Sequence, residues 1–339
     1  MQVAIDARAT ARREIGGVER LAHEMARRLP VLAPGRYRVC RPPAALAHRA
    51  GHAWEQFLLP LLRAQLIYCP ANLAPLASRR NVVVIHDVAP LREPEWYSPA
   101  YSRYQRAILP PIARRARLVI TVSEFSRGEI VAALGVPPER VRVVPNGVDE
   151  RFSPAVDPGP ARAAFGLERP YVLVVGTRIA RKNLAALAGA ARRLSERGVE
   201  LVAAGSGRGY MQAESGLEVR ALGYVPEELL PSLYRGAAAL ALPSLYEGFG
   251  LPAVEAMASG TPVVASDRGA LPEVCGDAAL LVDPTDETAL ADALLAAVED
   301  GGLAGRLARA GTERAAAFTW DRAAQLTDRA IEAVLYGKL

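Results

Sequence analysis

Two glutamates, Glu247 and Glu255, lie in the stretch of the chain whose residue types and spacing most clearly predict chemistry. Seven residues separate them, and Gly248 and Gly250 follow the first, where the backbone can approach a ligand closely. A carboxylate about one turn into a helix can accept two hydrogen bonds from a vicinal diol such as a ribose. We therefore expect Glu255 to hold a ribose and Glu247 to contact the other end of the same ligand. Alternatively, Glu247 is a solvated loop residue and Glu255 a favourable first-turn charge.

These glutamates belong to a predicted strand–loop–helix–strand unit. An apolar run over residues 237–242 predicts a buried strand, and Pro252 suits the first turn of a helix. Gly260 ends that helix before a second apolar strand at residues 263–265. Ligands of open α/β sheets bind outside the carboxyl ends of the strands, and a helix N-terminus favours a phosphate. The unit therefore predicts a site for a phosphorylated ligand.

Arg178 and Lys182 flank a second predicted strand-to-helix loop, between a strand at residues 171–175 and a helix that opens at residues 181–183. Both side chains could reach one diphosphate, because arginine can fork onto two oxygens and lysine supplies a compact charge. A basic pair at a helix start opposes the helix dipole, which needs a reason. Otherwise, these residues form a charged loop and a solvated helix start.

The stretch EGFGLPAVEAMASGTPVV, residues 247–264, resembles the E-x7-E signature of the retaining glycosyltransferases of family 4. Members of that family have the GT-B fold, an α/β architecture of two Rossmann-like, doubly wound domains that face each other across a cleft. The resemblance implies that Arg178 and Lys182 lie against the donor phosphates, that Glu255 holds the ribose and that Glu247 lies by the donor sugar. It further implies hexose transfer from a nucleotide-diphosphate sugar to an acceptor hydroxyl with retention, the leaving phosphate acting as the base.

Other positions carry the resemblance into the first half of the chain. The pair Gly16-Gly17 follows a strand predicted at residues 3–7, and His86-Asp87 follows one predicted at residues 82–85. By resemblance the glycines lie near the donor phosphates and the acceptor, and His86 faces the donor sugar as a further catalytic residue. Otherwise, the glycines form a simple turn and the histidine is bonded to a neighbouring carbonyl.

The remaining predicted substrate-binding residues lie in loops that follow predicted strands of the second half. By resemblance, the loop at residues 224–226 holds the nucleotide base largely through its backbone. These residues are Gly205, Tyr224, Val225, Gly248, Phe249, Gly250 and Leu251.

Length and linker signals predict two domains. A chain of 339 residues exceeds what one hydrophobic core usually organises. Residues 153–160 hold three prolines and a glycine, which places the boundary near residue 155. We expect an acceptor-binding domain over residues 1–155 and a nucleotide-sugar-binding domain over residues 156–318. By resemblance, the helical segment 319–339 crosses back onto the first domain.

The composition of the chain limits the cellular compartment and the ligands that we expect. Three cysteines argue against a disulfide framework, and no apolar run reaches the roughly 18 residues needed to span a bilayer. The first residues lack the layout of a signal peptide, so we expect a cytoplasmic protein. The net charge is +5, and all basic residues except Lys182 and Lys338 are arginines. No D-x-D triplet occurs, so we expect no metal and no cofactor, and we expect no nucleic-acid partner.

The segment at residues 91–117 mixes aromatic residues with arginines. Such a mixture suits the headgroup region of an anionic membrane, which predicts peripheral contact with the inner face of the cell membrane. Pro110 and Pro111 are expected to interrupt the segment. The alternative is an ordinary surface helix in an arginine-rich chain.

The HD pair and the aromatic-basic segment after it resemble mannosyltransferases of bacterial polysaccharide assembly. We therefore expect GDP-mannose as the donor, with a UDP-hexose as the second choice, and a glycan or lipid-linked acceptor. A sugar-nucleotide epimerase with the GT-B fold and a non-catalytic nucleotide-sugar-binding protein are the alternatives. An NAD(P) oxidoreductase would need a G-x-G-x-x-G fingerprint, whereas residues 205–209 read G-x-G-x-G.

Overall fold

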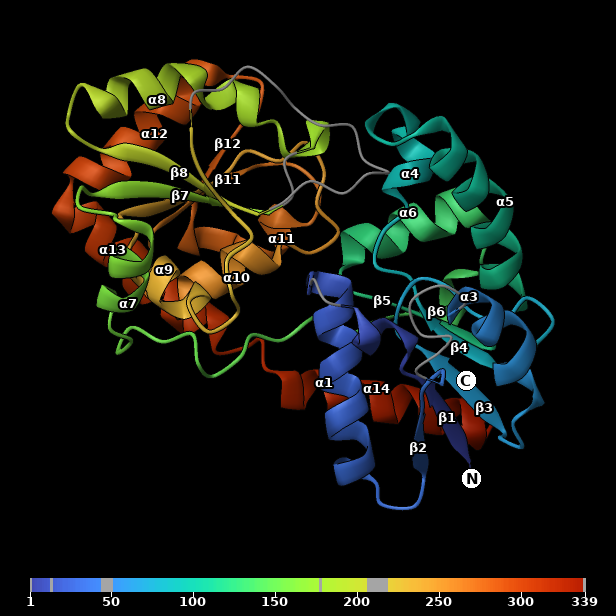
Figure 1. Ribbon diagram of the computed structural model, residues 1–339. Helices are drawn as coiled ribbons and strands as arrows, with labels where there is room; N and C mark the ends of the chain where they lie inside the picture. The colour runs from blue at the N-terminus through green and yellow to red at the C-terminus, as the bar shows by residue number, and fades with distance from the viewer. Residues whose placement is uncertain (1, 13–14, 44–50, 177–178, 206–218, 338–339) are drawn as a thin grey trace. The chain divides into compact units, whose positions relative to one another are not determined.

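The chain forms two units, each built around its own parallel sheet (Figure 1). The computed structural model describes residues 2–12, 15–43, 51–176, 179–205 and 219–337. Unit 1 comprises Met1–Arg92, Ala100–Gly147 and Trp320–Leu339, and unit 2 comprises Glu93–Pro99 and Val148–Thr319. Within the described residues, no helix combines the length and the apolar character that crossing a membrane requires.

The sheet of unit 1 has six parallel strands in the order β2-β1-β3-β4-β5-β6. Val3 in β1 lies opposite Tyr37 of β2 on one side and Leu66 of β3 on the other. Four of the six strands are buried along their whole length, as expected where helices cover both faces of a parallel sheet. The strands are β1 (Val3–Asp6), β2 (Tyr37–Cys40), β3 (Leu66–Cys69), β4 (Asn81–Val84), β5 (Leu118–Thr121) and β6 (Val141–Val143).

Helices cover both faces of this sheet (Figure 1). Helices α1 and α14 pack against each other, whereas α5, α6 and the π-helical turn Trp54–Leu58 contribute to a core with the other face. Side chains alternate between the two faces along each strand, and Ala4 of β1 points to the face that α5, α6 and the π-helical turn cover. The helices are α1 (Gly17–Leu32), α3 (Gly51–Ala53), α4 (Ala89–Arg92), α5 (Pro99–Arg115), α6 (Glu124–Leu134) and α14 (Trp320–Leu335).

Helix α14 is the last helix of the chain, and it belongs to unit 1. Trp320 and Ile331 are buried, and Asp328 forms an ion pair with Arg36, with 2.6 Å between the Arg36 nitrogen and the Asp328 oxygen. The hydroxyl of Tyr37 donates a hydrogen bond to the same carboxylate. Unit 1 is therefore completed by residues that follow all of unit 2 in the sequence.

The sheet of unit 2 also has six parallel strands, in the order β12-β11-β10-β7-β8-β9. The connection order reverses between β7 and β10, which makes the carboxyl ends of these two strands the topological switch point. The strands are β7 (Tyr171–Val175), β8 (Glu200–Ala204), β9 (Arg220–Gly223), β10 (Ala239–Leu242), β11 (Val263–Ser266) and β12 (Leu280–Val282).

Helices again cover both faces of the sheet (Figure 1). Helices α8 and α12 pack together over one face, and α10 packs against α9 and α13 over the other. The helices are α7 (Gly159–Phe165), α8 (Ala188–Ser195), α9 (Leu230–Gly236), α10 (Leu251–Ala258), α11 (Leu271–Cys275), α12 (Glu287–Glu299) and α13 (Gly301–Ala315).

Two sequence-based expectations about helices are wrong. Pro110 and Pro111 lie inside α5, which continues to Arg115 instead of being interrupted. Lys182 lies in a 3₁₀ turn, because Asn183 adopts a left-handed conformation with φ of 53° and ends that turn. The α-helix that follows begins only at Ala188.

Candidate functional site

The switch point of unit 2 brings together two loops that carry charged side chains. Strand β7 ends at Val175 and β10 at Leu242, and parallel strands end at the same edge of a sheet. Lys182 follows β7 and Glu247 follows β10, so residues that are 65 positions apart in the sequence meet. Both side chains are nearly buried, with exposed fractions of 7% for Lys182 and 6% for Glu247.

The Glu247 carboxylate is held by two cations. Lys182 Nζ donates to Glu247 Oε1 over 2.5 Å, and Arg181 lies 3.2 Å from Oε2. The same Arg181 nitrogen also donates to the Tyr246 carbonyl, while the Leu245 amide donates to the Arg181 carbonyl. These contacts join the loop after β7 to the two residues that precede Glu247.

The charge state of Glu247 follows from this pairing. Burial alone would raise the pKa of the carboxyl, but the charges of Lys182 and Arg181 outweigh burial and lower it to about 2. Glu247 is therefore ionised at neutral pH and has no proton to donate. A fixed negative charge of this kind can stabilise a positive charge that develops beside it.

Glycines permit the close approach of the loops at two places. At Gly205, which follows β8 and has φ of +137°, a Cβ atom would lie 2.1 Å from the Gly176 carbonyl oxygen. At Gly269, with φ of +63°, a Cβ atom would lie 2.8 Å from the backbone nitrogen and oxygen of Glu247. The amide of Ala270 donates to that same Glu247 carbonyl. The Glu247 backbone is thus held by Ala270 and lies so close to Gly269 that a side chain there would clash with it.

Glu255 lies in α10 and is also nearly buried. The Tyr234 hydroxyl, from α9, donates a 2.7 Å hydrogen bond to Glu255 Oε2, and Tyr234 is itself fully buried. This bond fixes one oxygen of the carboxylate and so sets the orientation of the other. Gly250 precedes the helix in a left-handed conformation, with φ of 99°.

The other predicted residues of unit 2 line the same loops or follow neighbouring strands. Phe249 is buried and packs edge-to-face on Phe318, with 5.6 Å between ring centroids, and Leu251 is the first residue of α10. Tyr224 directly follows β9 and is 46% exposed, whereas Val225 beside it is buried. Gly248 lies between Glu247 and Phe249.

His86 lies in unit 1, just after β4, and is buried. Its Nε2 atom is 3.0 Å from the Pro70 carbonyl oxygen, and burial lowers the pKa of the imidazole. A neutral ring that donates through Nε2 keeps Nδ1 as an acceptor. Asp87 accepts a hydrogen bond from the Ala89 amide at the start of α4. The contact of His86 with the Pro70 carbonyl is the one that the alternative interpretation of this histidine predicted.

The glycine pair of unit 1 opens α1, with Gly17 as the first helical residue and Gly16 before it. The Gly16 amide donates to Glu19 Oε2, and Arg12 pairs with the other oxygen of that buried carboxylate over 2.6 Å. The loop is thus tied to an acidic side chain of its own helix.

A buried ionic cluster lies at the topological switch point of unit 1. This is at the carboxyl ends of the neighbouring strands β1 and β3, between which the connection order reverses. Arg8 Nε donates to Glu55 Oε2 over 2.6 Å, and the Arg8 amide donates to the Asp6 carboxylate. Burial and the Glu55 charge raise the pKa of Asp6 to about 7. The sequence analysis did not predict this cluster, and Glu55 comes to it from the π-helical turn Trp54–Leu58.

Sequence reasoning also missed several residues around Glu247 and Glu255. Arg181 and Tyr234 contact these carboxylates directly, and Gly269 contacts the Glu247 backbone. Trp96, far away in the sequence, packs edge-to-face on Tyr246, with 6.4 Å between ring centroids. Only Arg181 carried a local signal, because it adjoins Lys182. Arg178 lies outside the described residues.

In the described ranges, no three His, Cys, Asp or Glu side chains are grouped as metal ligands.

Comparison with known proteins places the chain among glycosyltransferases. Residues 31–152 match the family model described as Glycosyltransferase Family 4, and residues 169–300 match that of Glycosyl transferases group 1. The O-antigen chain mannosyltransferase B of Escherichia coli is 32% identical over 301 residues, which cover 81% of this chain and 75% of that protein. An MMP alpha-(1->4)-mannosyltransferase of Mycolicibacterium hassiacum is 36% identical over 64% of this chain, but the match covers only 54% of that protein.

Solved structures share the fold at lower identity. A sucrose-phosphate synthase from Thermosynechococcus elongatus superposes with a TM-score of 0.76 at 21% identity, covering 99% of this chain and all of that one. Anabaena Alr3699/HepE in complex with UDP and glucose superposes with a TM-score of 0.74 at 20% identity, over 98% of this chain and all of that one. The expected GT-B fold is confirmed.

Proposed function

Because the chain belongs to glycosyltransferase family 4 and is a glycosyltransferase, we propose that it transfers mannose from GDP-mannose to a hydroxyl of a glycan or lipid-linked acceptor, with retention. The mannosyl donor is supported by the similarity of most of the chain to an O-antigen chain mannosyltransferase. A UDP-hexose is the second candidate, supported by the fold similarity to a protein that was solved with UDP-glucose.

The observation that carries the proposal is the buried Glu247 carboxylate at the switch point of unit 2, paired with Lys182 and Arg181. Departure of a nucleoside diphosphate leaves negative charge on its phosphates and positive charge at the anomeric carbon. Lys182, with Arg178, would stabilise the first charge, and the ionised Glu247 would stabilise the second and position the sugar. The diphosphate would share Lys182 with Glu247.

The rest of the donor would be held by groups around this cluster. Glu255 would accept hydrogen bonds from the ribose hydroxyls, with its orientation set by Tyr234. The backbone at Tyr224 and Val225 would hold the base. Backbone groups of the loops at Gly205 and at residues 248–251 would approach the phosphates and the sugar.

We assign acceptor binding to residues 1–155, and donor binding to residues 156–318. In the acceptor-binding part, Gly16, Gly17 and Asp87 would contact substrate, and His86 would offer Nδ1 as an acceptor to a sugar hydroxyl. We assign no enzyme nucleophile; the leaving phosphate would remove the acceptor proton on the same face of the sugar, and no metal would be required.

We also propose that the enzyme works at the inner face of the cell membrane. The support is α5, in which Tyr104 is 43% exposed and Arg103 and Arg106 are exposed as well. Aromatic rings and arginines together suit the headgroup layer of anionic lipids.

The first experiment is a melting-temperature panel with GDP, UDP, ADP, GDP-mannose and UDP-glucose, each with and without a chelator. A ligand that binds only the folded protein raises the melting temperature. We expect GDP and GDP-mannose to act selectively and the chelator to change nothing. Stabilisation by uridine nucleotides alone would contradict GDP-mannose as the donor, but it would remain consistent with a glycosyltransferase. Loss of the effect with chelator would contradict metal independence.

The second experiment compares Glu247→Gln with Glu200→Gln. Both remove a carboxylate charge from an ion pair in unit 2, but Glu200 pairs with the exposed Arg220 at the sheet edge. We expect Glu247→Gln to lower kcat by about 100-fold or more, as loss of one electrostatic group does at other active sites, and Glu200→Gln to keep wild-type activity. Full transfer by Glu247→Gln would refute the site. Conversion of the nucleotide sugar without acceptor would instead identify an epimerase.

A further inference from the structure

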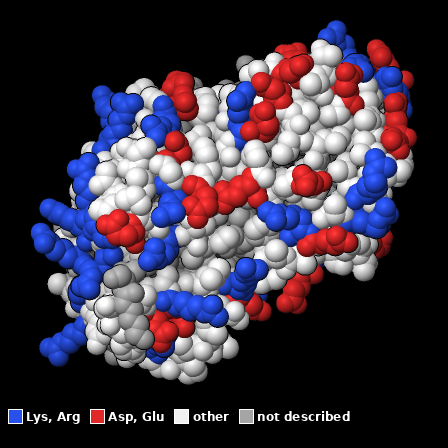
Figure 2. Space-filling model, turned by 180° about the vertical axis from the view of Figure 1, so that it is seen from behind, with Lys and Arg blue, Asp and Glu red and all other residues white. Residues whose placement is uncertain are grey.

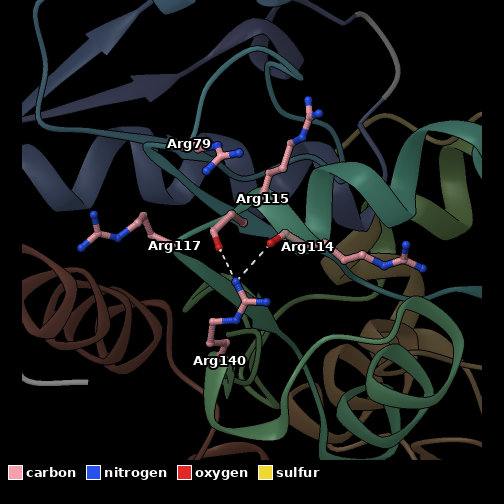
Figure 3. Close-up of a pocket in the computed structure, with 6 residues that line it drawn as sticks. Arg79, Arg114, Arg115, Arg117 and Arg140 are labelled. Atoms are coloured by element: carbon pink, nitrogen blue, oxygen red, sulfur yellow. Dashed lines mark hydrogen bonds between the residues drawn. The ribbon is translucent and has the colours of Figure 1, made fainter.

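Five arginines line one pocket of unit 1, with a cavity volume of about 480 Å³ (Figure 3). Their places in the chain explain why they meet. Parallel strands begin at the same edge of a sheet, and three of the arginines immediately precede or nearly adjoin the starts of β4, β5 and β6. The other two end α5. The five are Arg79, Arg114, Arg115, Arg117 and Arg140.

This pocket is separate from the candidate donor site. It belongs to unit 1, whereas Lys182 and Glu247 belong to unit 2. Within unit 1 it lies at the amino-terminal edge of the sheet, and His86 follows the carboxyl end of β4. Four residues of strand place these two edges roughly 13 Å apart.

Three of the five arginines have roles within the fold. Arg140 donates to the carbonyls of Arg114 and Ala116 at the end of α5, over 3.1 and 3.2 Å (Figure 3). Arg114 donates to the Leu134 carbonyl and Arg115 to the Leu76 carbonyl. Cations at a helix C-terminus are favourable, so these contacts account for Arg114, Arg115 and Arg140 and hold them in place.

No contact within the described fold accounts for the positions of Arg79 and Arg117. Across the described part of the chain, neither side chain takes part in a hydrogen bond or an ion pair. The residues that line the pocket include no Asp or Glu. The sequence contains no acidic residue over positions 56–86 or 96–123, which are the segments that supply four of the five arginines.

The lining of the pocket therefore concentrates positive charge, and the nearest carboxylate in the sequence is Glu139, which precedes Arg140 and does not line the pocket. In the space-filling view, Lys and Arg side chains gather along the left-hand rim of the drawn face, with fewer Asp and Glu among them (Figure 2). Like charges held together repel one another, and an anion that bridges them removes that repulsion. Guanidinium groups present forked donors that match the oxygens of a phosphate.

We propose that this pocket binds a phosphate or diphosphate group, as a second anion site of the protein. The cavity volume lies within the range of small-molecule sites and exceeds what a single ion needs. The chemistry fits both a soluble phosphorylated compound and the phosphate of an anionic lipid headgroup. Figure 3 draws the side chains of Arg114, Arg115 and Arg117 pointing away from one another. Arg114, Arg115 and Arg140 are held by carbonyls, so Arg79 and Arg117 would turn toward the ligand when it binds.

The soluble source is tested by calorimetric titration of the whole protein with pyrophosphate. Arg79→Gln/Arg117→Gln removes two charges from the pocket, and Arg38→Gln/Arg329→Gln removes two from exposed positions elsewhere in unit 1. We expect the first pair to weaken binding about tenfold or more and the second pair to change it little. Lys182→Met serves as the third variant, since it removes binding at the donor site and leaves the arginine pocket intact.

The lipid source is tested by cosedimentation with vesicles of phosphatidylcholine alone or mixed with phosphatidylglycerol. We expect binding only to the anionic vesicles, a loss of that binding in Arg79→Gln/Arg117→Gln, and retention in Arg38→Gln/Arg329→Gln. Rising salt should weaken either kind of binding, because the pocket is open to solvent.

Either result, a pocket-dependent affinity for pyrophosphate or for anionic vesicles, supports the proposal and identifies the source. The proposal is overturned when both variant pairs bind each probe like the wild type, or when both pairs lose binding equally. Pyrophosphate binding that disappears only in Lys182→Met also overturns it, and that outcome leaves the proposed transferase function standing.

Discussion

At the scale of single residues, the two glutamates of the signature differ in what surrounds them. Glu247 is held by cations and stays ionised, whereas Glu255 is held by a neutral hydroxyl. The spacing of the glutamates and glycines, together with the family resemblance, predicted a ligand-binding role for both positions. It could not predict Tyr234 or Arg181 as their partners, because contacts of this kind depend on which loops and helices meet in space.

The Tyr234 hydroxyl is predicted to matter for donor binding. Tyr234→Phe keeps the ring and its edge-to-face contact with Phe152 but removes the hydrogen bond to Glu255. We expect the KM for the donor to rise about tenfold, since a bond to a charged group contributes roughly 1.5–3 kcal/mol, and kcat to change little. Steady-state kinetics with varied donor measures this.

Tyr171→Phe is the matched control for that variant. It removes another buried tyrosine hydroxyl of unit 2, one that donates to the Leu233 carbonyl. We expect it to lower stability by about 1 kcal/mol without changing the donor KM. An equal rise in KM for the two variants would mean that Tyr234 has only a structural role.

The buried Asp6 predicts a pH dependence of stability. Burial and Glu55 raise its pKa from 3.8 to about 7 in the folded protein. Between these values the folded state holds a proton that the unfolded state has released, so the free energy of unfolding falls as pH rises through this range. We expect Asp6→Asn to remove part of that fall, on the order of a few kcal/mol between pH 5 and 8.

Urea unfolding at several pH values checks this expectation, with Asp277→Asn as an exposed control. The amide of Asp6→Asn can still accept the hydrogen bond from the Arg8 backbone. Identical pH profiles for the wild type and Asp6→Asn would contradict a raised pKa at this position.

At the scale of elements, loops after parallel strands build the site, and glycines set how closely they approach. The alternation of apolar runs predicted most strands of both sheets, because strands buried on both faces read as continuous apolar stretches. Asn183 shows where such reasoning fails: this left-handed residue ends a 3₁₀ turn at the place where a helix was expected to begin. Long-range contacts such as that of Trp96 with Tyr246 leave no periodic signal.

Gly269→Ala tests the glycine that contacts the Glu247 backbone. The added Cβ would lie 2.8 Å from backbone atoms of Glu247, and the φ of +63° is unfavourable for alanine. We expect kcat to fall roughly 100-fold, because a displacement of about 1 Å in a catalytic group can have that effect, and the melting temperature to fall. Transfer assays and thermal unfolding measure both.

Gly128→Ala provides the control, since a Cβ atom there meets open space inside α6. Alanine is the better helix former by about 1 kcal/mol, so this variant should be as stable as the wild type or more so, with full activity. Wild-type kcat in Gly269→Ala would show that the loop adjusts without moving Glu247.

At the scale of the whole molecule, unit 1 depends on a helix from the other end of the sequence. Asp328 in α14 pairs with Arg36 and accepts from Tyr37. Asp328→Ala leaves both partners without this acceptor, and we expect a loss of about 1–3 kcal/mol in the free energy of unfolding. Asp292→Ala, which breaks the exposed pair with Arg193, should change it by less than about 1 kcal/mol. Equal effects in urea unfolding would rule out a special role for α14.

The placement of α14 also has a consequence for how the protein is made. During translation, β1 to β6 of unit 1 are synthesised first, followed by the 172 residues of Val148–Thr319 and only then by α14. At about 5–20 residues per second, that intervening stretch takes roughly ten to thirty seconds to synthesise. During this interval the apolar face that α14 later covers stays open on the nascent chain. Until α14 has been made, this open face can associate with other apolar surfaces, which favours aggregation of the nascent protein.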